Sequence, residues 1–283
     1  MQYLVSYILG KGYLFGFYIL GFYEKSMHLK VYFASKSTIT MDKSNNNSNA
    51  NTYKYLDIIT VVFVLVLVLS NIASSAKIID WGISLGEIPL SFDAGTVLFP
   101  ISYIIGDVLV EVYGYKRSRR IIWIGFGALA FSAFVFWLVQ VLPGETTWQA
   151  MVGQDSYDQI LGSMSSGAIV VASLIGYFAG SFSNAIMMAL MKVLTKGKLL
   201  WSRTIGSSVV GQAFDTFAFI FFASALGVFP WSLFWSLTIT NYIFKLIMEI
   251  VVTPITYWVV NNLKRIEGVD TFDEDTNLTP FKF

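Results

Sequence analysis

Three pairs of polar side chains lie within long apolar stretches of this chain. They are Asp107 with Glu111, Gln212 with Asp215, and Lys245 with Glu249. Residues three or four apart share one face of a helix, so the members of each pair would point to the same side. An ionised side chain at membrane depth costs several kcal/mol and usually faces a cavity or a partner inside a helix bundle. The spacing therefore indicates a polar binding site inside an apolar protein.

The acidic pair has two interpretations. Asp107 and Glu111 would repel each other one helical turn apart, which suits a substrate or proton site. Alternatively Glu111, about one turn from Lys116, pairs with the basic residues that follow the helix. The sequence leaves both interpretations open.

The other two pairs also have a structural and a functional interpretation. Gln212 and Asp215 could bind a ligand, or they could hydrogen-bond between helices, with Gly211 allowing a close approach. Lys245 and Glu249 could neutralise each other, or Lys245 could pair with one of the two aspartates across the bundle. A lone carboxylate is costly for packing alone, which favours a functional role for Asp215.

Further candidates are polar or interrupt a helix. Asn71 and Asn184 lie near membrane depth, where they could bind a ligand or join helices. Tyr103, one turn before the first aspartate, is a candidate stacking surface. Pro100 and Pro254 lie inside apolar stretches, where each would interrupt the helical hydrogen bonds and free carbonyl groups.

The composition indicates a membrane protein. The chain has 283 residues, of which 55% are hydrophobic and 13% charged, whereas soluble domains carry about 25% charged residues. With no cysteine and a single histidine, His28, disulfides, thiol catalysis and histidine-based triads are excluded from the core. The net charge of +1 gives no indication of nucleic-acid binding.

Six apolar stretches are about long enough to cross a hydrocarbon core of about 30 Å. They run approximately over residues 55–74, 92–113, 121–142, 167–190, 206–228 and 233–260. The sequence therefore predicts an all-α, six-helix transmembrane bundle over residues 55–263. Asparagines in spans one and four and aspartates in spans two and five indicate a 3+3 inverted repeat, which is common in secondary transporters.

The loops predict the orientation of the bundle. Two loops and the segment after span six are rich in basic residues, namely Lys116, Arg117, Arg119 and Arg120, then Lys192, Lys196, Lys198 and Arg203, and finally Lys264 and Arg265. The opposite loops contain Lys77 as their one basic residue. The positive-inside rule therefore predicts a multi-pass protein with both termini in the cytoplasm.

The segments outside the bundle are less regular. Residues 1–54 form an N-terminal extension with an apolar start and a polar, asparagine-rich part at 44–51 that we expect to be disordered. Either an extra helix precedes the bundle, or residues 1–40 are a start-site artefact and translation begins at Met41. The loop 143–166 is expected to hold a short surface helix, and 264–283 to be a flexible cytoplasmic tail.

A wider motif carries a family resemblance. It consists of Pro100-x-x-Tyr103-x-x-x-Asp107-x-x-x-Glu111-x-Tyr113-Gly114 before the basic turn, Asn71 with Lys77, and Trp201-x-Arg203 followed by Ser207, Ser208, Gly211, Gln212 and Asp215. With these residues the chain resembles the queuosine precursor transporter family, also called the vitamin uptake transporters. The resemblance covers about residues 55–263. It implies import of cyano- or aminomethyl-deazaguanine across the bacterial cytoplasmic membrane, without a cofactor or enzymatic activity.

The candidate side chains suit such a substrate. A carboxylate, Asp107 or Asp215, could accept the ring N–H and the exocyclic amino group of a guanine-like edge. Gln212, Asn71 or Asn184 could donate to the carbonyl. An aromatic ring such as that of Tyr103 could stack on the base, and another carboxylate could carry a coupling proton.

Three other classes compete with a carrier that works alone. A substrate-binding component of an energy-coupling-factor transporter would present small residues on its first helix, but Val61–Leu69 is bulky. An intramembrane aspartyl enzyme could use Asp107 and Asp215, although the usual motifs around such aspartates are missing. A channel would require a homo-oligomer, which the sequence leaves open.

Overall fold

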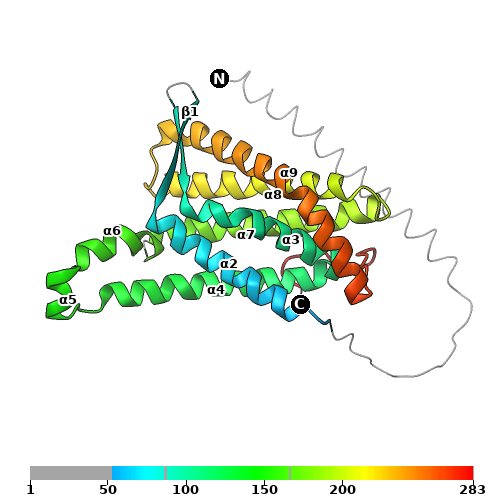
Figure 1. Cartoon of the computed structure of the whole chain (residues 1–283), viewed down its shortest axis with the longest axis horizontal. Helices are drawn as coiled ribbons and strands as arrows, with labels where there is room; N and C mark the ends of the chain where they lie inside the picture. Colours follow the sequence, from blue (N-terminus) through cyan, green and yellow to red (C-terminus); the bar gives the residue numbers. More distant parts are fainter. Residues whose placement is uncertain (1–52, 86–87, 166, 283) are drawn as a thin grey trace, which may run out of the picture. The chain divides into compact units, whose positions relative to one another are not determined.

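Six helices that correspond to the predicted spans form one bundle in the computed structural model, which describes residues 53–85, 88–165 and 167–282 (Figure 1). They are α2 (Leu56–Ala76), α3 (Phe99–Tyr113), α4 (Tyr115–Val141), α7 (Gly167–Leu194), α8 (Leu200–Ala225) and α9 (Phe234–Glu267). The predictions for an extra helix, disorder or a late start in residues 1–52 lie outside the described residues.

Five segments of the described chain are long and apolar enough to cross a membrane, and they coincide with all or most of α2, α4, α7, α8 and α9. Large apolar side chains such as Phe131, Phe217 and Val251 are exposed on their outer surfaces. Helices satisfy their own backbone hydrogen bonds, as a hydrocarbon environment requires. The chain is therefore a multi-pass membrane protein built as a helical bundle.

The helix of the second predicted span begins seven residues later than expected. Phe92 belongs to a strand, residues Ala94–Leu98 form the 3-10 helix η1, and α3 begins only at Phe99. Pro100 lies in the first turn of α3, where a missing N–H costs no helical hydrogen bond. It therefore starts a helix rather than interrupting one. The 15 residues of α3 rise about 22 Å, less than a full membrane crossing.

Two loop regions contain secondary structure of their own. An antiparallel hairpin of β1 (Ile78–Leu85) and β2 (Ile88–Asp93) joins α2 to η1 and was not predicted. The loop between α4 and α7 contains two short helices, α5 (Thr146–Met151) and α6 (Gln154–Ser165), where one surface helix was predicted. Both regions lie at the end of the bundle where α2 and α4 terminate (Figure 1).

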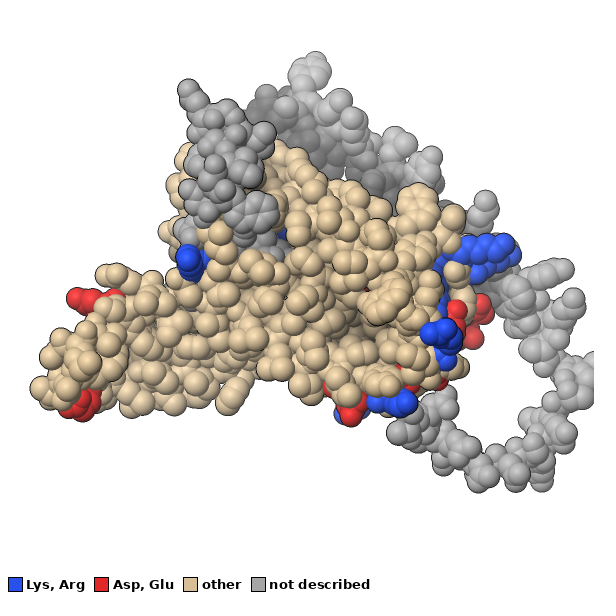
Figure 2. All heavy atoms as spheres, in the orientation of Figure 1, with Lys and Arg blue, Asp and Glu red and all other residues tan. Residues whose placement is uncertain are grey.

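The opposite end of the bundle is here called the basic end. The turn between α3 and α4, the turn between α7 and α8, and the end of α9 lie there. Glycines occupy all three chain reversals, and Gly114, Gly197 and Gly268 have φ angles of 83°, 74° and 67°, a region that disfavours other residues. Glu267 accepts hydrogen bonds from the backbone N–H groups of Lys54 and Tyr55, so α2 begins where α9 ends. Figure 2 shows most of the Lys and Arg atoms gathered at this end.

Residues 268–282, here called the tail, lie against the basic end. Asp273 accepts a hydrogen bond from the backbone N–H of Tyr115 at 2.9 Å, which caps the start of α4. Arg119 donates to the carbonyls of Asn277 and Thr279 at 2.9 and 2.7 Å. A flexible segment was predicted because the tail is acidic, but its backbone carbonyls and apolar side chains bind residues from α4 and α7 that lie far away in the sequence.

Candidate functional site

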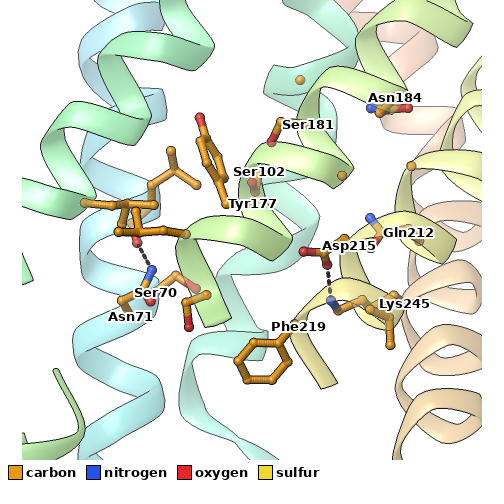
Figure 3. Close-up of a pocket in the computed structure, with 18 of the residues that line it drawn as sticks. Ser70, Asn71, Ser102, Tyr177, Ser181, Asn184, Gln212, Asp215, Phe219 and Lys245 are labelled. Carbon is orange, nitrogen blue, oxygen red and sulfur yellow. Dashed lines mark hydrogen bonds and ion pairs between the residues drawn. The ribbon is translucent and has the colours of Figure 1, made fainter. Parts of the chain in front are cut away.

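A cavity of about 600 Å³ lies among α2, α3, α4, α7, α8 and α9. Its volume is typical of small-molecule sites. Six of the nine predicted site residues line it, namely Asn71, Tyr103, Asn184, Gln212, Asp215 and Lys245. Figure 3 shows five of them, all but Tyr103, around the same space.

The polar centre of the cavity is an ion pair between α8 and α9. The Nζ atom of Lys245 lies 2.5 Å from Oδ2 of Asp215, and both side chains keep some exposure to the cavity, 17% and 26%. Of the sequence-based alternatives for Lys245, the structure therefore shows the pairing across helices. A carboxylate next to an ammonium group offers a ligand one acceptor and one donor side by side.

Glycines on α7 make room for this aspartate. A Cβ atom added to Gly180 would lie 2.4 Å from Cβ of Asp215, and one added to Gly176 would lie 3.2 Å from its Oδ1. On α8, a Cβ atom at Gly211 would lie 2.6 Å from Cβ of Asn184. Small residues let two membrane helices approach closely, and here this contact places Asp215 and Asn184 in one wall of the cavity.

Residues that the sequence did not single out complete the wall. Tyr177 donates its hydroxyl hydrogen to the carbonyl of Ile122 at 3.0 Å, and Ser70, Ser181 and Phe219 also line the cavity (Figure 3). Serines and aromatic residues occur throughout the chain, so no spacing pattern distinguishes these positions. The side chain of Asn71 donates to the carbonyl of Leu67 at 2.9 Å, which leaves its oxygen for a ligand.

Asp107 and Glu249 lie behind the cavity wall rather than in it. Their exposed fractions are 1% and 0%. Gly106, which precedes Asp107, and Lys245, one helical turn before Glu249, do line the cavity. Oδ2 of Asp107 and both carboxylate oxygens of Glu249 accept no hydrogen bond from the described residues. Both acids are therefore buried outside the cavity, and each keeps at least one carboxylate oxygen without a hydrogen bond from the described residues.

Glu111, the ninth predicted residue, is separate from the cavity. Its fully buried carboxylate receives two hydrogen bonds from Arg203, Nε to Oε2 at 3.1 Å and Nη2 to Oε1 at 2.7 Å, and one from Lys264 at 2.6 Å. Lys192 donates to its backbone carbonyl at 2.6 Å. The alternative in which Glu111 pairs with basic residues therefore describes its surroundings, although its partners come from α7, α8 and α9 instead of the adjacent turn.

One acidic residue of the tail joins these cations. Asp270 lies 2.5 Å from Lys192 and 2.8 Å from Lys264. Partial burial alone would raise the pKa of Asp270, but hydrogen bonds and attraction from the two lysines outweigh it and hold the pKa below its ordinary value. We call Glu111, Lys192, Arg203, Lys264 and Asp270 the Glu111 cluster. It connects α3, α7, α8, α9 and the tail.

The described residues contain no group of three or more His, Cys, Asp or Glu side chains placed to hold a metal ion. The cavity presents hydrogen-bonding groups, an ion pair and aromatic surfaces to a ligand. Its lining mixes apolar side chains with a few convergent polar groups, which is typical of sites for small organic molecules.

Comparisons with known proteins show which sequences the chain is similar to. Residues 93–259 match the model of a family described as "Putative vitamin uptake transporter". Two curated relatives are each 27% identical to the chain: one from Bacillus subtilis over 169 residues, 59% of this chain and 71% of the relative, and one from Haemophilus influenzae over 172 residues, 60% and 68%. Both are named "Probable queuosine precursor transporter".

No solved structure is significantly similar to the chain. The family match covers the segment from the end of the hairpin into α9, which includes eight of the nine predicted site residues, all but Asn71. The family and relative names describe transporters rather than enzymes. The chain belongs to the vitamin uptake transporter family.

Proposed function

We propose that this protein imports queuosine precursors, the cyano or aminomethyl forms of deazaguanine, across the cytoplasmic membrane. The observation that carries the proposal is the cavity inside the helical bundle, with the Asp215–Lys245 pair in its wall. The names of the two curated relatives support the choice of substrate.

The ion pair is chemically complementary to a guanine-like edge. Such an edge presents a ring N–H and an exocyclic amino group beside a carbonyl oxygen. Asp215 can accept from the two donors while Lys245 donates to the carbonyl, and hydrogen bonds to charged groups are among the stronger ones in proteins. Gln212 and Asn184 can bind the remaining polar atoms, and Tyr103 supplies an aromatic surface for the base. Asp215, which faces the cavity, suits this role better than Asp107, which does not.

We further propose that transport is coupled to a proton held by Asp107 and Glu249. Burial penalises a carboxylate far more than a neutral carboxylic acid, and two carboxylates close together repel each other. Binding one proton neutralises one of the two carboxylates, which removes the repulsion between two charges and lowers the burial penalty. The pair lies immediately behind the cavity, so binding of substrate in front can influence its protonation.

The proposed topology has six membrane passes with the basic end in the cytoplasm. The positive-inside rule supports this orientation, and α3 with η1 would complete the pass that α3 is too short to make alone. The exposed stripe Val61, Leu65 and Leu69 on α2 is bulky and suits contact with lipid. This favours a carrier that works alone over a component of an energy-coupling-factor transporter. A 3+3 inverted repeat is part of the proposal, whereas a homo-oligomer is not required.

Binding and uptake of a radiolabelled deazaguanine, in cells unable to make their own precursor, test the substrate. We expect Asp215→Asn to weaken binding about 10–100-fold, because it replaces a charged acceptor by a neutral amide. The matched control Asp275→Asn alters an exposed carboxylate of the tail and should behave like the wild type. Unchanged affinity in Asp215→Asn would refute this role.

A second substitution separates coupling from binding. In Asp107→Asn the substrate should still bind, but accumulation against a gradient should fail because the pair loses its exchangeable proton. Accumulation at the wild-type level and with the wild-type pH dependence would contradict proton coupling at this site.

A further inference from the structure

The cavity is closed toward the basic end. At that end its lining stops at Leu109, Val110 and Ser118, about one turn before α3 and α4 meet at Gly114. At the other end it reaches Met164 of α6 and Phe229, which follows α8. Among the described residues, no member of the Glu111 cluster lines the cavity. The cluster therefore lies between the cavity and the basic end.

The cluster holds four helices together at this level. Glu111 of α3 is bound by Arg203 of α8 and Lys264 of α9, and Lys192 of α7 donates to its backbone carbonyl. Both Lys192 and Arg203 have 1% exposure. Any opening of the basic end that separates these helices must break ion pairs that are well shielded from water, where such pairs are strongest.

The tail covers the cluster and is bound to it. Lys192 donates to Asp270 at 2.5 Å and to the carbonyl of Thr271 at 2.7 Å. The ring of Phe272 lies 4.7 Å from the same ammonium group. Lys192 therefore contacts α3 and the tail at once, and release of the tail removes three of its contacts.

A second set of contacts anchors the tail to the outside of α4 and α7. Trp123 donates its indole N–H to the carbonyl of Pro280 at 2.9 Å, and the ring of Phe281 stacks on Phe178 with centroids 5.9 Å apart. Thr271 packs on Gly114, where an added Cβ atom would come within 2.6 Å of its Cγ2. The tail thus joins the turn between α3 and α4 to α7.

We propose that the Glu111 cluster and the tail together form the gate that closes the substrate cavity toward the basic end, and that each transport cycle requires the tail to detach. This inference rests on the proposed carrier function. A carrier exposes its site to one side at a time, and the structure has the cavity closed at the end where the tail is bound.

Thiol accessibility tests the gate without substrate. The chain has no cysteine, so Ser118→Cys provides a single reporter at the closed end of the cavity. A membrane-impermeant thiosulfonate applied to the basic-end side should label it slowly. Adding Asp270→Ala should increase the rate about tenfold, which corresponds to about 1.4 kcal/mol of lost closure energy. The control Glu274→Ala, an exposed tail carboxylate, should leave the rate unchanged. Equal rates in the Asp270 and Glu274 variants would overturn the proposal.

A reversible cross-link tests whether the tail must detach. Lys116 of α4 and Asn277 of the tail line the same polar pocket, so Lys116→Cys and Asn277→Cys can be joined by a reducible bismaleimide. Uptake should fall to background after cross-linking and return after reduction. A cross-linked protein that transports at the rate of the unlinked variant would overturn the requirement for detachment.

The two tests separate failure of the gate from failure of the carrier. If the unlinked protein takes up no deazaguanine, the proposed substrate is wrong and the accessibility experiment alone decides on the gate. If the unlinked protein transports and cross-linking has no effect, the carrier function stands and the gate fails.

Discussion

The contact between α7 and α8 yields the sharpest prediction, through the substitution Gly180→Ala. The added methyl carbon would lie 2.4 Å from Cβ and 3.2 Å from Cα of Asp215, whereas carbon atoms in contact prefer about 3.5–4.0 Å. The helices must therefore separate by about 1 Å, and overpacking of this kind typically costs about 1–3 kcal/mol. Because Ala favours a helix over Gly by about 1 kcal/mol, the net loss in the free energy of unfolding is about 0–2 kcal/mol.

A matched variant isolates the steric term. An added Cβ atom at Gly127 of α4 meets nothing within 4 Å, so Gly127→Ala gains the same helix propensity without the clash. Thermal unfolding in detergent should place Gly180→Ala about 1–3 kcal/mol below Gly127→Ala. Substrate affinity should fall only in Gly180→Ala, because the separation displaces Asp215. Equal stability and equal affinity of the two variants would show that the helices do not pack as closely as described.

Two further predictions concern the Glu111 cluster. Arg203→Ala leaves Glu111 buried with fewer partners and should lower the free energy of unfolding by about 3–5 kcal/mol. Arg203→Lys should recover only part of that loss, because an ammonium group cannot form the bidentate contact of a guanidinium group. A loss below about 1 kcal/mol for Arg203→Ala in thermal unfolding would contradict the prediction. The pKa of Asp270 is lowered in the folded protein, so its stabilisation should be complete above the ordinary aspartate pKa of about 3.9 and should disappear as the pH falls through the lower folded value. The difference in melting temperature between wild type and Asp270→Asn should therefore shrink on acidification, and a difference that grows below pH 4 would reverse the sign of this argument.

Much of the architecture could be predicted because the apolar residues within a segment largely determine whether it forms a membrane helix. Runs of apolar residues crossing the bilayer appear directly in the sequence, and five of the six predicted stretches correspond to helices of sufficient length. The exception is the predicted stretch 92–113. Residues 92–98 are apolar enough to extend a span, but they form the end of a hairpin and a 3-10 helix, because Pro100 favours a helix start and the strand pairing with residues 78–85 depends on contacts beyond the segment.

The predicted site residues lie in different surroundings, and their spacing along the sequence could not predict this. Side chains four apart on one helix were expected to act together, yet Asp107 and Glu111 enter different environments, and Lys245 of α9 binds Asp215 of α8. The helical repeat specifies which residues share a face, but not which neighbouring helix that face meets.

By itself, the sequence determined that this is a helical membrane protein with ionisable groups at membrane depth, since length, hydropathy and charge are properties of each segment alone. The tertiary structure decided which charges neutralise one another. Arg203 and Lys264 reach Glu111 from 92 and 153 positions away, and the tail binds α4 from more than 150 positions away. Such pairs form only when helix packing has fixed the distances, because an ion pair depends on the separation of its atoms in space and not along the chain.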